Sequence, residues 1–278
     1  MEPFTLSSML GTAPVGVLVQ SSRECATQLR TIEAWAAEHG LEVVDLGTSA
    51  EPNGLASDCQ LVIALGGDGT ILRALQLAMA HRAVVLGVNL GHVGFLADIH
   101  GDELGAALER IAGGEAQIDE RTALVAEIQA EQPRRVIAFN DVVVARLSGF
   151  GTARLRVQVG GESLLVLKGD GVVIASPTGS TAYTVGAGGP AVAPSLDAIV
   201  ITPLATQGSP LRSLVVDGSE TVRVVTEQSS APVNVELDGR ETLAMPTPGV
   251  LEIHAAARKA RLVRTQPRTF YRDLATRL

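Results

Sequence analysis

The residues with the clearest capacity for chemistry are Gly66–Thr70, the sequence GGDGT, which follows the apolar run Leu61–Leu65. Glycines let the backbone approach a ligand closely, and the unpaired N–H groups that begin the following helix would face a phosphate. A carboxylate repels phosphate, so Asp68 needs another role: it either holds a magnesium ion or accepts a proton from an attacking hydroxyl group. The alternative is that Asp68 only caps the helix.

Three further stretches interrupt apolar runs with polar side chains. Asn140 and Asp141 open an apolar strand, and an amide beside a carboxylate can bind the hydroxyl pair of a ribose. Lys168–Gly171 displays a cation and an anion at a turn, and Ser176–Tyr183, SPTGSTAY, offers hydroxyl groups and an aromatic face to a polyhydroxylated or phosphorylated ligand. The alternatives are an Asx turn, an ordinary glycine turn and a solvated loop.

Several familiar sites are absent from the sequence. It contains no Gly-x-x-x-x-Gly-Lys-Ser/Thr phosphate loop and no Gly-x-Ser-x-Gly elbow. The partial dinucleotide fingerprint that begins at Gly67 has Leu72 in place of its third glycine, and the five histidines show no zinc-ligand spacing. These absences argue against hydride transfer, zinc hydrolysis and serine hydrolysis.

Composition indicates a globular protein with an aliphatic core. The 278 residues are 46% hydrophobic and 3% aromatic, and the net charge of −8 argues against sequence-independent binding of nucleic acid. Cys25 and Cys59 fit a reducing compartment, as buried small side chains. Because we find no targeting segment and no apolar run long enough for a membrane span, we expect a cytoplasmic protein that binds neither membrane nor nucleic acid.

Patterning predicts an α/β domain followed by an all-β domain. Apolar strands alternate with amphipathic helices as far as about residue 112, which is typical of a doubly wound parallel sheet. Short strands separated by Gly, Pro, Ser and Asp then follow, including one over Arg135–Ala145, and indicate an antiparallel β-sandwich. A terminal helix over Thr269–Leu278 should return to the first domain. We therefore expect a domain of residues 1–114 completed by 262–278, and a second domain of residues 115–261.

These motifs together resemble the NAD kinase family. The likeness rests on GGDGT at 66–70, FND at 139–141, KGDG at 168–171 and SPTGSTAY at 176–183, and extends to GVNLGHVGFLAD at 87–98 and AGGP at 187–190. It covers roughly residues 60–245. GGDGT alone also occurs in diacylglycerol and sphingosine kinases and in phosphofructokinases, whereas the combination is specific.

The resemblance implies transfer of the γ-phosphoryl group of ATP, or of polyphosphate, to the adenosine 2′-hydroxyl of NAD, giving NADP. It implies a divalent metal such as Mg²⁺, assembly as a homodimer or homotetramer, and Asp68 as the catalytic residue near that hydroxyl. Asp68 could instead hold the metal. The implied binding residues for substrate and donor are Gly66, Gly67, Gly69, Thr70, Arg73, Asn140, Asp141, Lys168, Asp170, Thr178, Ser180, Thr181, Ala182, Tyr183, Gly186, Ala205 and Arg240.

The chain departs from the family pattern at several positions. Asp141 replaces a frequent Glu, Gly186 a frequent Ser, and Arg240 lies near the position of a Gln. The segment Gln207–Ser213 also differs, which leaves NAD, NADH and a related nucleotide as alternative acceptors. Two other hypotheses are a related GGDGT kinase with an altered nucleoside or lipid acceptor, and a non-catalytic NAD-binding regulator.

Overall fold

The structure is a computed structural model and describes residues 3–4, 11–21, 24–50, 53, 58–91, 94–130, 132–207, 211–266 and 270–277. Two compact units make up the chain. The first comprises Met1–Glu120 and Ala260–Leu278, and the second comprises Arg121–Lys259. No helix within the described ranges is both long enough and apolar enough to cross a membrane.

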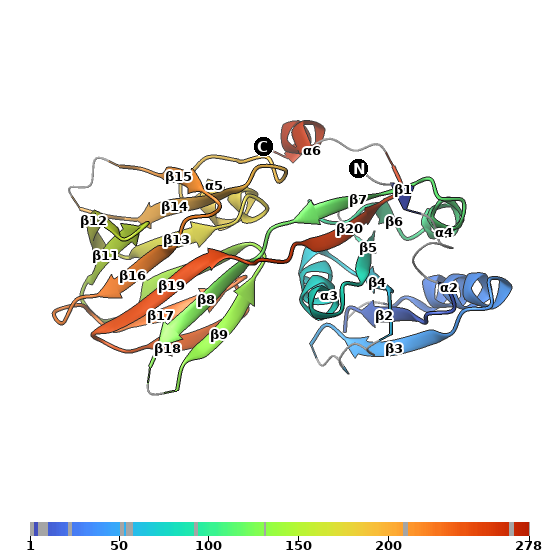
Figure 1. Ribbon diagram of the computed structural model, residues 1–278, viewed down its shortest axis with the longest axis horizontal. Helices are drawn as coiled ribbons and strands as arrows, with labels where there is room; N and C mark the ends of the chain where they lie inside the picture. Colours follow the sequence, from blue (N-terminus) through green and yellow to red (C-terminus); the bar gives the residue numbers. More distant parts are fainter. Residues whose placement is uncertain are drawn as a thin grey trace. The chain divides into compact units, whose positions relative to one another are not determined.

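The first unit is built on an eight-stranded sheet with the order β1-β7-β20-β5-β4-β2-β3, with β6 beside β5 (Figure 1). The pairings of β2 with β3 and β4, and of β5 with β4, β6 and β20, are parallel. The strands are β1 (Pro3–Phe4), β2 (Val15–Val19), β3 (Val43–Thr48), β4 (Leu61–Leu65), β5 (Val84–Asn89), β6 (Ile99–His100), β7 (Ala116–Arg121) and β20 (Ala260–Arg264).

Helices cover both faces of this sheet. Alternate side chains of β2, β4 and β5 share one core cluster with α2 (Ala26–Glu38) and α4 (Leu104–Ala112). Helix α3 (Asp68–His81) packs on the opposite face, where Gly87 leaves room for Ile71. Helix α6 (Phe270–Arg277) ends the chain. The central strands read as continuous apolar runs because both of their faces are buried.

The second unit consists of two six-stranded sheets with the orders β15-β14-β13-β10-β17-β18 and β12-β11-β16-β19-β8-β9, whose neighbours all pair antiparallel. The strands are β8 (Leu124–Gln129), β9 (Arg134–Ala138), β10 (Asp141–Arg146), β11 (Ala153–Val159), β12 (Glu162–Gly169), β13 (Gly171–Ala175), β14 (Ala198–Leu204), β15 (Leu214–Asp217), β16 (Val222–Thr226), β17 (Val233–Leu237), β18 (Glu241–Met245) and β19 (Gly249–Ala255).

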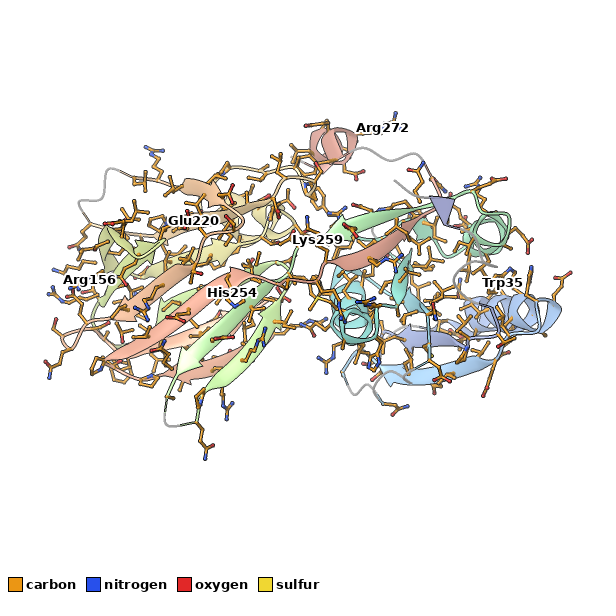
Figure 2. The ribbon with its side chains drawn as sticks, viewed as in Figure 1. Trp35, Arg156, Glu220, His254, Lys259 and Arg272 are labelled. Atoms are coloured by element: carbon orange, nitrogen blue, oxygen red, sulfur yellow. The ribbon has the colours of Figure 1, made fainter. Side chains whose placement is uncertain are left out.

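A single apolar core lies between these two sheets, with side chains from nearly every strand. In β10, Val142 and Val144 face this core, whereas Val143 joins a smaller cluster on the other face of its sheet. Polar side chains such as Arg156 and His254 project from the outer face of the second sheet (Figure 2). The predicted fold class, a parallel α/β domain followed by an antiparallel all-β domain, is confirmed.

Individual elements differ from the prediction. The single strand expected over Arg135–Ala145 is wrong: β9 and β10 belong to different sheets, and Phe139–Asn140 forms the crossover between them. The loop expected over Ser176–Tyr183 contains a 3-10 turn, η1 (Gly179–Thr181), and leads into the short helix α5 (Tyr183–Gly186). Several short strands were not predicted, namely β1, β6, β7, β15, β18 and β20.

Candidate active site

The Gly66–Thr70 turn joins the buried strand β4 to helix α3. Gly66 donates its N–H to the Val88 carbonyl of the neighbouring strand (2.9 Å), and a Cβ atom at position 66 would press against the Thr70 side chain. Gly67 is the N-cap residue of α3. The first N–H groups of a helix have no partner within it, so this end of the parallel sheet suits an anionic ligand.

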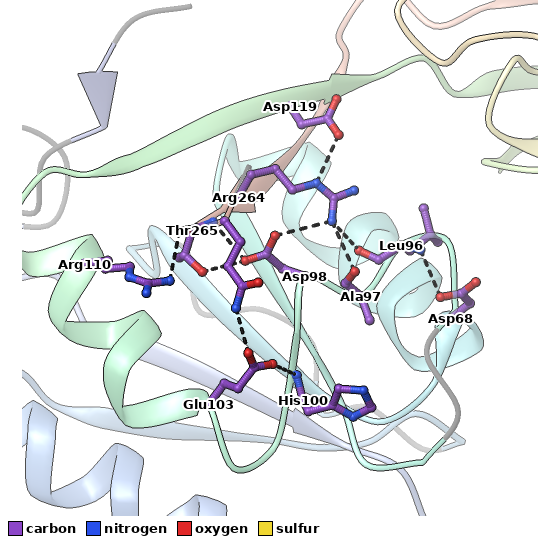
Figure 3. Close-up of polar contacts among 11 residues, drawn as sticks. Asp68, Leu96, Ala97, Asp98, His100, Glu103, Arg110, Asp119, Arg264 and Thr265 are labelled. Atoms are coloured by element: carbon purple, nitrogen blue, oxygen red, sulfur yellow. Dashed lines mark hydrogen bonds and ion pairs between the residues drawn. The ribbon is translucent and has the colours of Figure 1, made fainter. Parts of the chain in front are cut away.

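Asp68 is the first residue of α3 and follows the N-cap residue, Gly67. Its Oδ2 accepts the N–H of Phe95 (2.8 Å), and its Oδ1 accepts the N–H of Leu96 (3.0 Å; Figure 3). The capping alternative is therefore wrong. Each oxygen of an ionised carboxylate has two acceptor sites, so Asp68 retains the capacity to accept a proton or to bind a cation.

Gly94 is needed for this contact, because a Cβ atom at position 94 would overlap the Asp68 carboxylate. We expect Gly94→Ala to push the carboxylate away from the Phe95 and Leu96 amides. A displacement of about 1 Å in a catalytic group costs about 100-fold in rate. The rate of the reaction that the resemblance implies, measured by NADP formation, should therefore fall by about that factor, while thermal unfolding shows a folded protein.

A matched control for that substitution is Gly105→Ala, in helix α4 of the same unit. A Cβ atom there would make only an ordinary van der Waals contact with Thr31. Since alanine favours helix more than glycine does, we expect unchanged activity and equal or higher stability. Equal rates for the Gly94 and Gly105 variants would contradict the tight contact.

The other predicted residues of the first unit lie on the first two turns of α3. Gly69 is half-buried and Thr70 is buried beneath the turn. Arg73 is half-buried, and its Nη1 donates to the Gln76 side chain on the same helix (2.9 Å). A guanidinium group one turn from the helix N-terminus adds positive charge near the helix end that suits an anionic ligand.

In the second unit, the predicted pair Asn140–Asp141 is held by a residue that sequence analysis did not assign. The carboxylate of Asp238 accepts the backbone N–H groups of Phe139 (3.0 Å), Asn140 (2.6 Å) and Asp141 (3.3 Å). Asp238 has a left-handed backbone, with φ of +51°. It directly follows β17, which pairs with β10, and it fixes the crossover between the two sheets.

Burial dominates the electrostatics of this pair of carboxylates. Asp141 is 4% exposed, and burial together with the neighbouring Asp238 and Glu236 carboxylates raises the pKa of Asp141 to about 7. The Tyr183 amide, which donates to the Asp141 carboxylate, acts in the opposite direction. Burial also raises the pKa of Asp238, although three backbone N–H groups and Arg240 favour its ionised form. The site therefore contains a carboxyl group that titrates near neutral pH.

The Ser176–Tyr183 segment packs directly on this crossover. The Ser176 hydroxyl donates to the Phe139 carbonyl, and the Ser176 backbone N–H donates to the Asn140 backbone carbonyl (2.9 Å). A Cβ atom on Gly179 would overlap the backbone of Asn140. The structure thus brings the predicted Asn140, Asp141 and Tyr183 together.

Within that segment the predicted hydroxyl groups differ in accessibility. Ser180 is fully buried, and its hydroxyl bonds to Pro177 (2.7 Å) and Val192 (2.8 Å), so it holds the segment in place. Thr178 is also buried. The side of the segment open to a ligand is formed by half-buried Thr181 and exposed Ala182, Tyr183 and Gly186.

The remaining predicted residues lie elsewhere in the second unit. Register pairs Asp141 with Ala175 and Ala145 with Gly171, so Lys168–Gly171 lies at the opposite end of this strand pair from Asp141. There Lys168 is exposed, Asp170 binds Arg146 (Nε–Oδ1, 2.6 Å), and exposed Ala205 has φ of +44°. Arg240 is exposed near Asp238. The predicted residues of this unit thus form two separate groups.

Two motif segments are only partly visible. Within Gly87–Asp98, residues 92–93 lie outside the described residues, as do residues 208–210 of Gln207–Ser213. The part of the chain that the structure describes contains no group of three or more His, Cys, Asp and Glu side chains that could hold a metal ion.

The chain is similar to proteins of one family. Residues 16–116 match the family model of the ATP-NAD kinase N-terminal domain, and residues 139–265 match that of the C-terminal domain. A protein named NAD kinase from Moorella thermoacetica is 39% identical over 76% of this chain and 68% of its own length. One of the same name from Rhodococcus jostii is 34% identical over 93% of this chain and 82% of its own length.

Solved structures show the same fold. The yeast NADH kinase complexed with NADH has a TM-score of 0.79 at 21% identity, covering 95% of this chain and 87% of its own. An NAD kinase from Archaeoglobus fulgidus in complex with ATP has a TM-score of 0.76 at 22% identity, covering 94% and 97%. The resemblance expected from the motifs is thereby confirmed: the chain belongs to the NAD kinase family.

Proposed function

We propose that the chain transfers the γ-phosphoryl group of ATP to the adenosine 2′-hydroxyl of NAD, forming NADP and ADP. The relatives named NAD kinase support the reaction, and the solved complexes with ATP and NADH support these two classes of substrate. The observation that carries the proposal is the Asp68 carboxylate, which two backbone N–H groups hold at the N-terminus of α3.

In this mechanism the first unit binds ATP, the phosphoryl donor. Backbone amides of Asp68 and Gly69, at the start of α3, bind phosphate oxygens, and Arg73 adds positive charge. Asp68 orients the attacking hydroxyl group and accepts its proton, while the bond between the γ-phosphorus and its bridging oxygen breaks and ADP leaves. Phosphoryl transfer needs little covalent participation from the protein, so position and charge account for most of the catalysis.

A magnesium ion fits the donor side as a companion of the triphosphate. Mg²⁺ is usually held by one or two carboxylates together with substrate phosphates, and keeps several waters. Asp68 has free acceptor sites for such an ion, whereas the described residues offer no cluster that would form an all-protein cage. When bound, the ion would neutralise charge on the transferring phosphoryl group.

In this proposal the second unit binds NAD, the phosphoryl acceptor. Asn140 and Asp141 bind the adenosine ribose, and Tyr183, which is 48% exposed, offers a stacking face. Because the group of Lys168, Asp170 and Ala205 lies at the other end of the strand pair, a second copy of the chain could supply it to the same ligand. We therefore propose a homodimer or homotetramer; sedimentation showing only monomer with NAD present would exclude it.

The ionisation of Asp141 should control NAD affinity. If the carboxylate accepts hydrogen bonds from the ribose, a pKa of about 7 leaves about a tenth of the protein competent at pH 6. We expect the Kd for NAD, measured by calorimetry without ATP, to rise about tenfold from pH 8 to pH 6. Asp141→Asn should bind more weakly and lose this pH dependence, and an unchanged pH dependence in that variant would contradict the assignment.

The same group also links stability to pH. The pKa of Asp141 is raised in the folded protein from about 3.9 in the unfolded chain. Between about pH 4 and pH 7 the folded state therefore binds more protons, and the contribution of Asp141 to stability falls as the pH rises. We expect Asp141→Asn to raise the unfolding temperature at pH 8 more than at pH 5.

The direct test is to incubate the purified protein with NAD, ATP and Mg²⁺ and to measure NADP with an NADP-specific dehydrogenase. NADP formation is expected. ADP release with a different phosphorylated nucleoside or lipid would favour a related kinase, and NAD binding without ADP release would favour a regulator. We also propose a cytoplasmic location, because Cys25 and Cys59 are buried and free, as in a reducing compartment.

A further inference from the structure

A network of buried charges lies directly behind the segment that binds Asp68 (Figure 3). Arg264, the last residue of β20, has a side chain that is 12% exposed. Its Nη1 donates to the backbone carbonyls of Leu96 (3.0 Å) and Ala97 (3.3 Å), and its Nε donates to Asp119 (3.1 Å). The Arg264 guanidinium group thus connects β20 to the segment between β5 and β6.

Leu96 contacts both Asp68 and Arg264. Its N–H donates to Asp68, and its carbonyl accepts from Arg264. Asp68 and Arg264 are therefore separated by the backbone of a single residue, which is held from both sides. Because the adjacent Phe95 amide holds the other carboxylate oxygen, any shift of this segment moves both hydrogen bonds to Asp68.

The orientation of the guanidinium group is itself fixed. Asp98, whose side chain is fully buried, lies 3.8 Å from Nη1 of Arg264. The other oxygen of Asp98 accepts from the amide (2.8 Å) and the hydroxyl (2.7 Å) of Thr265. A planar guanidinium group presents donors in fixed directions, so it can serve a carboxylate and two carbonyls at once, which a lysine ammonium group cannot do with the same geometry.

We propose that Arg264 is a positioning residue for the phosphoryl-transfer reaction: it holds the Leu96–Ala97 backbone so that the amides of Phe95 and Leu96 orient the Asp68 carboxylate. This inference rests on the proposed role of Asp68. Arg264 acts through the backbone and has no contact with substrate in this scheme. A displacement of about 1 Å at a catalytic group costs about 100-fold in rate, which sets the scale of the effect.

Steady-state kinetics of Arg264→Gln and Arg264→Lys test the proposal. We expect kcat to fall about 10- to 100-fold in Arg264→Gln and less in Arg264→Lys, which keeps the charge and one donor direction. The KM values for NAD and ATP should change less than twofold, because the binding groups remain. Rates are expressed per folded molecule, with the folded fraction measured by circular dichroism at the assay temperature.

Chemical rescue distinguishes a positioning role of Arg264 from a merely structural one. Millimolar guanidinium added to Arg264→Ala should raise kcat several-fold, at concentrations that leave the wild-type rate and the folded fraction of the variant unchanged. If guanidinium raises the rate only in proportion to the folded fraction, Arg264 is a structural residue and the proposal is overturned.

Arg110→Gln is the matched control. The Nη1 of Arg110 donates to the carbonyl of Thr265 (3.3 Å), the residue after Arg264, so its loss perturbs the same strand end. We expect lower stability and an unchanged kcat. Equal losses of kcat in the Arg110 and Arg264 variants would overturn the proposal. A normal kcat in Arg264→Gln would also overturn the proposal. The Asp68→Asn variant then shows whether only the role of Arg264 fails or the role of Asp68 fails as well. An inactive Asp68→Asn variant leaves the proposed function intact, whereas an active one refutes the role of Asp68 itself.

Discussion

Replacing Asp68 by asparagine should lower kcat by about 10²- to 10⁴-fold, the usual contribution of a positioned acid or base. Asparagine matches the shape of aspartate but cannot accept the proton of the attacking hydroxyl group. NAD should still bind with near-normal affinity, because Asn140, Asp141 and Tyr183 lie in the second unit. Rates of NADP formation and calorimetric titration with NAD measure the two effects separately.

The control for this variant should also replace a carboxylate that accepts two N–H groups, one of them from the backbone. Glu103 accepts the N–H of His100 (2.8 Å) and the side-chain amide of Gln266 (2.8 Å) in the same unit (the His100 bond is drawn in Figure 3). Glu103→Gln should therefore lower the stability of the protein as Asp68→Asn does, but without lowering the rate. A rate for Asp68→Asn within a few-fold of the wild type would refute its assignment as the base.

Gly179→Ala should disrupt the proposed acceptor site. The added methyl group would overlap the backbone of Asn140, and neither the Ser176–Tyr183 segment nor the crossover can move without breaking the hydrogen bonds between them. Overpacking of this kind typically costs about 1–3 kcal/mol. We expect a lower unfolding temperature and at least tenfold weaker NAD binding, measured by thermal unfolding and calorimetry.

Gly151→Ala is the comparison for that substitution, because a Cβ atom at position 151 would meet no atom within 4 Å. It lies in the same unit and should leave both stability and NAD affinity unchanged. If Gly179→Ala behaved like Gly151→Ala, the close packing of the two motif segments would be refuted.

The sequence predicted the alternation of strands and helices well because most of that signal is local. The apolar run Leu61–Leu65, which the glycine turn ends, is a strand with the same bounds. Strand β20 was missed because Arg261 and Arg264 interrupt its short apolar pattern, and it is a strand through its place between β7 and β5. The β9–β10 crossover was missed because strand patterning continues through Phe139 while the chain changes sheets.

For the candidate site, the sequence predicted the motifs but not the contacts that hold them. Nothing near Asp68 in the sequence indicates that its partners are Phe95 and Leu96, which depend on the packing of α3 beside β5. Asp238 precedes a glycine, a pair that is common in turns, and its role follows only from the pairing of β10 with β17. Contacts between residues distant in sequence are set by tertiary packing, and single-sequence patterns do not encode them.

In the proposed reaction this chain places a phosphoryl group on NAD with Asp68 as the base. Phosphorus NMR of the products formed from NAD, ATP and Mg²⁺ tests it directly. We expect a new phosphomonoester resonance at the adenosine 2′ position with the wild type, together with one ADP for each NADP, and almost none with Asp68→Asn. ADP formation that leaves the dinucleotide unphosphorylated, or an equal yield from both proteins, would contradict it.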